Sequence, residues 1–145
     1  MSTEQNKALS RQLIEEVFNQ GNTSLVDELF APDFVEHEEL PPGVPPGREA
    51  VKVLPTMFRS AFPDFKVTID DMIAEGDKVV VRSTWTGTQK GEFMGIPSTG
   101  KSVSFGVVDT IRIAGGKFVE HWGMMDNMSI MQQLGVVPAP GEVAG

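Results

Sequence analysis

The second half of the chain alternates apolar and polar residues over long stretches, and this pattern constrains the fold more than any other feature. Four stretches read as strands with one buried face: 65–69, 78–88, 101–113 and 117–125. Glu75-Gly76-Asp77 and Gly115-Gly116 lie between neighbouring stretches and are typical of tight hairpins. The pattern therefore predicts a meander of long antiparallel strands.

The first half has helical spacing instead. Ser2 or Thr3, with Gln5 close behind, can cap a first helix that Gly21 ends. A short second helix is expected from Thr23 or Ser24 up to a break at residues 31–33, and a third over residues 48–62. Pro55 lies inside the third stretch and predicts a kink or a break near Val53.

Four shorter segments complete the chain. Residues 34–37 read as a short extended segment, and residues 40–47 hold four prolines and must form a loop. The Gly-containing excursion over Gly91–Gly100 is expected to be a lid or a dimer contact. Residues 126–134 predict a terminal helix, and residues 136–145 an extended tail.

Helices followed by a run of strands indicate an α+β fold rather than repeated βαβ units. We expect a single domain over residues 1–145, with its core in about 7–135. Long strands that curl around the N-terminal helices would form a cone-shaped α+β barrel, with helices packed on a curved antiparallel sheet that encloses a pocket.

Composition excludes several classes of partner and site. The net charge is −8 and the Lys and Arg residues are scattered, so we expect neither nucleic acid nor a charged membrane surface as a partner. The chain has no Cys and only two His, so we expect no metal site. The polar N-terminus lacks the apolar core of a signal peptide, so a cytoplasmic location is the default expectation.

Four segments together resemble a known family. They are residues 34–37 with the Pro/Gly loop after them, 61–65, 86–101, and 116–135, which contains Glu120-His121-Trp122. In their order and spacing they resemble the SnoaL-like polyketide cyclases of ester cyclase type, in the nuclear-transport-factor-2-like superfamily, over about Lys7–Leu134. The resemblance implies a homodimer, a cone-shaped pocket without metal or organic cofactor, and a carboxylate that acts as acid and base in an intramolecular aldol ring closure.

Asp126 is the leading catalytic candidate. It follows Met124-Met125 near the end of the last predicted strand, and apolar neighbours raise the pKa of a carboxyl group. The resemblance places the acid/base aspartate near this position. The alternative is that Asp126 only caps the terminal helix, with Ser129 three residues on.

His121, His37 and Asp109 are the other catalytic candidates. His121 could assist proton transfer, although strict alternation puts it on the sheet face opposite to Trp122. His37 precedes the Pro-rich loop, where we expect the mouth of the pocket. Asp109 lies in phase with apolar residues, so a buried carboxylate there requires either a partner such as Arg112 or a function.

Several large apolar residues are candidates for the pocket wall, because ligand sites are mostly apolar with few polar groups. They are Met57, Phe58, Phe62, Trp85, Phe105, Trp122 and Met124. The alternative for each of them is plain core packing.

Together with these residues, the resemblance implies a cofactor-independent enzyme that acts on a small hydrophobic carbonyl compound. A second acid facing Asp126, with Asp109 as the obvious choice, would favour an isomerase, a dehydratase or an epoxide hydrolase on the same fold. A fully apolar pocket with Asp126 and both His residues outside it would favour a ligand-binding protein without turnover.

Overall fold

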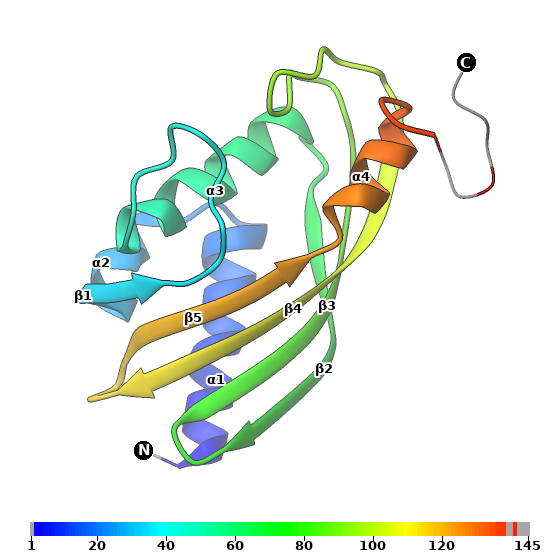
Figure 1. Ribbon diagram of the computed structural model, residues 1–145. Helices are drawn as coiled ribbons and strands as arrows, with labels where there is room; N and C mark the ends of the chain where they lie inside the picture. Colours follow the sequence, from blue (N-terminus) through cyan, green and yellow to red (C-terminus); the bar gives the residue numbers. More distant parts are fainter. Residues whose placement is uncertain (1, 139–140, 142–145) are drawn as a thin grey trace.

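Four antiparallel strands form most of the sheet, as predicted. In this computed structural model, which describes residues 2–138 and 141, the order is β1-β5-β4-β3-β2 (Figure 1). The meander consists of β2 (Lys66–Glu75), β3 (Lys78–Thr88), β4 (Ser102–Ala114) and β5 (Lys117–Met125). Most of the predicted extended tail, 136–145, lies outside the described residues.

The fifth strand, β1, differs from the sequence prediction. β1 (Phe30–Glu36) runs through Pro32 and pairs in parallel with β5, so the sheet is not purely antiparallel. A proline is tolerated there because β1 lies at the edge of the sheet, where one row of backbone N–H groups has no strand to bind. The pairing sets Glu36 opposite His121, and the candidate site depends on this register.

The predicted helices are present, with local differences in their geometry. α1 (Thr3–Gln12) begins at a Ser2–Gln5 capping box and continues as a π-helix over Leu13–Asn19. A 3₁₀ turn (Thr23–Leu25) leads into the short α2 (Val26–Leu29). α3 (Arg48–Ala61) contains Pro55 without a break, and α4 (Asn127–Leu134) follows β5. None of the helices in the described residues is long and apolar enough to cross a membrane.

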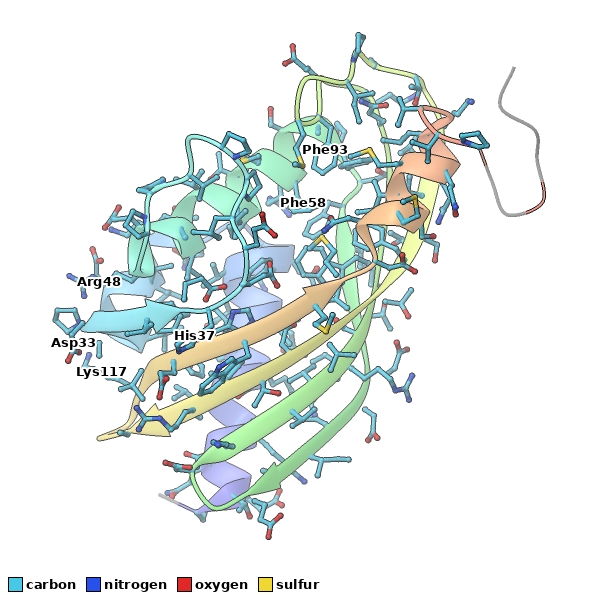
Figure 2. The ribbon with its side chains drawn as sticks, viewed as in Figure 1. Asp33, His37, Arg48, Phe58, Phe93 and Lys117 are labelled. Atoms are coloured by element: carbon cyan, nitrogen blue, oxygen red, sulfur yellow. The ribbon has the colours of Figure 1, made fainter. Side chains whose placement is uncertain are left out.

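The core lies between the helices and the inner face of the curved sheet (Figure 1). Phe58 of α3 is at its centre: five aromatic rings lie within 6.4 Å of its ring, those of Phe62, Phe65, Trp85, Phe93 and Phe105. Figure 2 shows Phe58 and Phe93 close together beside the end of α3. The packing of α3 against the sheet therefore rests on aromatic contacts.

The end of α3 comes so close to β3 that Gly87 has no room for a side chain. A Cβ added at Gly87 would lie 2.7 Å from the Cβ of Phe62, whereas one added at Gly106 on β4 would meet nothing within 4 Å. We expect Gly87→Ala to lower the free energy of unfolding in urea by about 1–3 kcal/mol, because Phe62 must move. Gly106→Ala is the control and should change it by less than about 0.5 kcal/mol. Equal losses for both variants would contradict this account.

Candidate functional site

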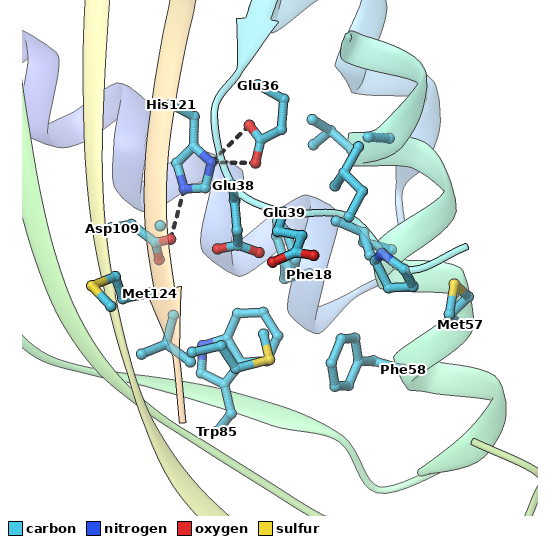
Figure 3. Close-up of a pocket in the computed structure, with 18 of the residues that line it drawn as sticks. Phe18, Glu36, Glu38, Glu39, Met57, Phe58, Trp85, Asp109, His121 and Met124 are labelled. Atoms are coloured by element: carbon cyan, nitrogen blue, oxygen red, sulfur yellow. Dashed lines mark hydrogen bonds and ion pairs between the residues drawn. The ribbon is translucent and has the colours of Figure 1, made fainter. Parts of the chain in front are cut away.

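A cavity of about 500 Å³ opens between α3, the loop after β1 and the inner face of the sheet (Figure 3). Most of its wall is apolar and comes from elements far apart in sequence. These apolar residues include Phe18, Phe34, Val51, Leu54, Met57, Phe58, Trp85, Phe93, Val107 and Ile111. A space of this size and character suits a small apolar molecule.

The polar side chains gather at one end of the cavity, around His121. His121 Nδ1 lies 2.6 and 2.7 Å from the two carboxylate oxygens of Glu36, and its Nε2 lies 2.7 Å from Asp109 Oδ1 (Figure 3). The three residues come from β1, β4 and β5, whose register points all three side chains inward. Their side chains are only 5–18% exposed.

This arrangement keeps His121 positively charged. Burial opposes the charged imidazolium, but the hydrogen bonds and charges of Asp109 and Glu36 outweigh it and raise the pKa of His121 to about 10. At neutral pH both ring nitrogens therefore carry a proton, and each proton is donated to a carboxylate. His121 is the single cation at this end of the cavity among the lining residues that the structure describes.

Glu38 lies beside this group, in the loop after β1. Burial raises the pKa of Glu38 to about 7; the nearby charge of His121 lowers it, and those of Asp109 and Glu36 raise it further. A carboxyl group with a pKa near neutrality exchanges its proton readily in the physiological range.

Neither Glu36 nor Glu38 was among the sequence candidates. The run Glu36-His37-Glu38-Glu39 before a Pro-rich loop was the available signal.

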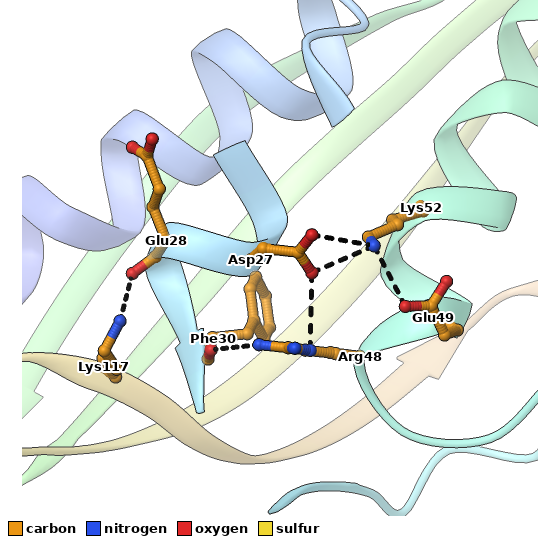
Figure 4. A network of polar contacts seen from close by, with 7 residues as sticks. All are labelled: Asp27, Glu28, Phe30, Arg48, Glu49, Lys52 and Lys117. Carbon is orange, nitrogen blue, oxygen red and sulfur yellow. Dashed lines mark hydrogen bonds and ion pairs between the residues drawn. The ribbon is translucent and has the colours of Figure 1, made fainter. Parts of the chain in front are cut away.

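The loop that carries Glu38 is anchored at both ends. At its start, the backbone N–H of His37 donates to the carbonyl of His121 (2.9 Å). At its end, Arg48 contacts Asp27 (Nε to Oδ1, 3.4 Å) and the Phe30 carbonyl, as Figure 4 shows. Lys52 binds the same Asp27 carboxylate at 2.9 Å. The anchors tie the loop to α2, β1, α3 and β5.

Two of the candidate catalytic residues lie outside this cavity. Asp126 is exposed and accepts a hydrogen bond from the backbone N–H of Ser129, so it is the N-cap of α4. Its side chain is open to solvent, so it lacks the burial on which its sequence argument depended. His37 lies on the outer face of the sheet, stacked on Trp122 at 4.8 Å and bonded to Glu120 at 2.8 Å. His121 and Asp109 do line the cavity.

The seven apolar candidates divide in the same way. Met57, Phe58 and Trp85 line the cavity, and Met124 lies at its rim with 80% of its surface exposed. Phe62 and Phe105 are buried in the core away from the cavity wall. Trp122 points to the outer face of the sheet, opposite to His121, as strict alternation requires.

The described residues also contain one grouping with the spacing of a metal site. Glu36, Glu38 and His121 each bring one ligand atom within 4.8 Å of the others. However, both imidazole nitrogens of His121 are engaged with carboxylates, and a ligand nitrogen must be free of its proton. We therefore interpret the group as an ion-pair network.

Comparisons with known proteins agree on one family. The sequence pattern of the SnoaL-like polyketide cyclases matches residues 8–134. The nogalonic acid methyl ester cyclase of Streptomyces nogalater is 30% identical over 119 residues, which cover 81% of this chain and 89% of the relative. The structure of TsrD from Streptomyces laurentii superposes with a TM-score of 0.84 at 30% identity, covering 94% of this chain and 99% of TsrD. IdmH from Streptomyces antibioticus gives 0.76 at 34% identity, covering 90% and 98%.

The pKa of Glu38 has a consequence for stability. The folded pKa of about 7 lies above the ordinary value of 4.5, so folding binds extra protons and the free energy of unfolding falls as pH rises from 4.5 to 7. Glu38→Gln removes this loss. We expect the variant to gain about 1–2 kcal/mol over wild type between pH 5 and pH 8, allowing for the partial exposure of Glu38.

Urea unfolding at the two pH values measures this change. Glu39→Gln removes an exposed carboxylate from the same loop and is the matched control; its difference from wild type should stay small at both pH values. A difference between Glu38→Gln and wild type that does not change with pH would contradict the assigned burial of the Glu38 carboxylate.

Proposed function

Because the chain belongs to the SnoaL-like polyketide cyclase family, we propose that it closes a ring in a small apolar carbonyl compound by an intramolecular aldol reaction. The reaction needs a proton removed from a carbon next to one carbonyl group and a proton delivered to the oxygen of another. Side chains alone can perform both transfers.

The observation that supports this proposal is the division of the cavity into an apolar body and one polar end. The apolar wall holds the carbon skeleton and excludes water from it. At the polar end, the charged His121 lies between Glu36 and Asp109. Fixed charge in a partly buried site stabilises the negative charge that develops on an enolate or alkoxide oxygen, since it needs no reorganisation during the reaction.

The charges of the wall favour an uncharged substrate. The acidic lining residues are Glu36, Glu38, Glu39 and Asp109, and His121 is the only basic one in the part of the wall that the structure describes. A carboxylate on the ligand would meet repulsion from this surplus of negative charge. An ester would not, and the relative from Streptomyces nogalater is named for a methyl ester.

Ring closure of nogalonic acid methyl ester, followed by chromatography of the product, tests the proposed activity. We expect turnover by the wild type. The double variant Glu36→Gln/His121→Asn removes the central cation together with one of its two carboxylate partners, so Glu36 is not left as a buried charge without a partner. Asp109 loses its bond to His121, and a thermal melt of the variant checks that it is folded. We expect kcat to fall by about 100-fold or more.

The control for this assay is His37→Asn, which changes a histidine outside the cavity. It should keep kcat within about twofold of wild type. Loss of turnover in the control, or full turnover in the double variant, would contradict the assignment of the polar end as the reaction centre.

We further propose that the protein is a homodimer that pairs through the outer face of the sheet. Exposed apolar side chains gather on this face, where Ile73, Val80, Val108 and Trp122 are 36–60% exposed. Such a face is typical of a protein interface.

Light scattering tests this arrangement. We expect the wild type to have twice the mass of one chain and Val108→Glu to have the mass of the monomer. Met128→Glu, on α4, is the control and should leave the dimer intact. A monomeric wild type would overturn this assignment.

A further inference from the structure

Glu38 lies at the polar end of the cavity, and its carboxylate is not bonded to another side chain among the described residues. Glu36 and Asp109 both accept hydrogen bonds from His121. Within the described residues, the Glu38 carboxylate has no side-chain or backbone donor. Figure 3 shows it extending from the loop toward the middle of the cavity. A bound molecule can therefore reach it directly.

Gly123 of β5 makes room for this carboxylate. A Cβ added at residue 123 would overlap Glu38 Oε1, and it would lie 2.7 Å from His121 Cε1 and 3.0 Å from Asp109 Oδ1. The side chain of residue 123 would point inward, as those of His121 and Met125 do, since successive residues of a strand alternate between faces. Glu38 thus occupies the space that a side chain on the strand would otherwise fill.

We propose that Glu38 is the catalytic residue that takes and returns the proton, and that Gly123 is the residue that admits it to the site. The inference deepens the proposed ring closure and rests on it only for the identity of the substrate. It differs from the sequence prediction, which gave this role to Asp126. That residue caps α4 outside the cavity.

The charge state of Glu38 suits both directions of transfer. Burial first, and then the neighbouring carboxylates, bring its pKa to about 7. At this pKa a carboxylate is a stronger base than an exposed glutamate, and its acid form remains available at neutral pH. The groups that face it from the adjacent elements are His121 on β5, Asp109 on β4 and Glu36 on β1.

The proposed step balances without a further reactant. The Glu38 carboxylate takes the proton from the carbon next to the first carbonyl, and the C–H electron pair becomes the enolate. The enolate carbon forms a bond to the second carbonyl carbon, whose π electrons move to its oxygen. That alkoxide takes the proton back from the Glu38 carboxyl group, so the cyclic product is an isomer of the substrate.

A substrate-independent probe tests whether Glu38 acts as a base in the cavity. In 5-nitrobenzisoxazole a base removes the proton from C3, the electron pair forms the nitrile, and the N–O bond breaks to release a coloured phenolate. We expect wild-type protein to accelerate this elimination, with a rate that rises with pH and levels off above about pH 7. We expect Glu38→Gln to lower the rate at least ~10-fold.

Two further variants sharpen this test. Gly123→Ala should also lower the rate, because the added methyl group takes the place of Glu38 Oε1. Asp126→Asn is the control: asparagine caps a helix about as well as aspartate, so the fold is kept and the rate should stay within about twofold of wild type.

The outcomes separate this inference from the proposed function. An unchanged rate or pH profile in Glu38→Gln, a loss in Asp126→Asn, or no elimination by the wild type would overturn the role of Glu38. If elimination depends on Glu38 but the ester is not cyclised, the role of Glu38 stands and the proposed ring closure fails. If the wild type and Glu38→Gln cyclise the ester equally well, ring closure stands and the role of Glu38 fails. A thermal melt of Glu38→Gln confirms that it is folded.

Discussion

A protonated histidine between two buried carboxylates is the interaction on which the rest of the site depends. Glu36, His121 and Asp109 join β1, β5 and β4. β1 is a short edge strand that contains a proline, so its backbone pairing with β5 is limited, and the side-chain contacts add to it. Removing one member of such a group leaves a buried charge without a partner, which costs several kcal/mol. The position of β1, and with it the start of the next loop, is thereby fixed.

The same group sets the charge balance of the cavity. One cation neutralises one carboxylate, so the other and Glu38 remain as surplus negative charge in a partly buried space. Burial in this negatively charged space raises the pKa of Glu38, for which the described residues provide no hydrogen-bond donor. The network that holds the strands together thus also tunes its neighbour, and stability and reactivity cannot be changed independently at this end of the cavity.

Much of the fold is readable from local sequence, whereas the site is not. Period-two alternation and paired turn residues give β3, β4 and β5 nearly to their ends and only the first half of β2, because a half-buried strand imposes that pattern on its own residues. β1 could not be predicted in the same way. Pro32 indicates the end of an element rather than the middle of a strand, and the parallel pairing with β5 joins residues about 85 positions apart. Asp109 could be singled out as a polar residue in phase with apolar residues of a predicted strand. His121 could be named as a candidate, but alternation left open whether it or Trp122 faces the pocket. Glu36 and Glu38 could not, since only the β1–β5 register brings them to His121.

The placement of Glu38 on a loop raises the question of how a loop can hold a reacting group as firmly as a strand does. Two anchors fix the loop ends, at the His37 N–H and at Arg48. Neither anchor alone fixes the tip of a glutamate side chain, which has three rotatable bonds. The missing side chain at Gly123 solves this problem: the carboxylate packs against the backbone of β5, between Asp109 and His121. Its position is therefore defined by the strand, although its covalent attachment is to the loop. A side chain at residue 123 would displace the carboxylate without removing any charged group from the site.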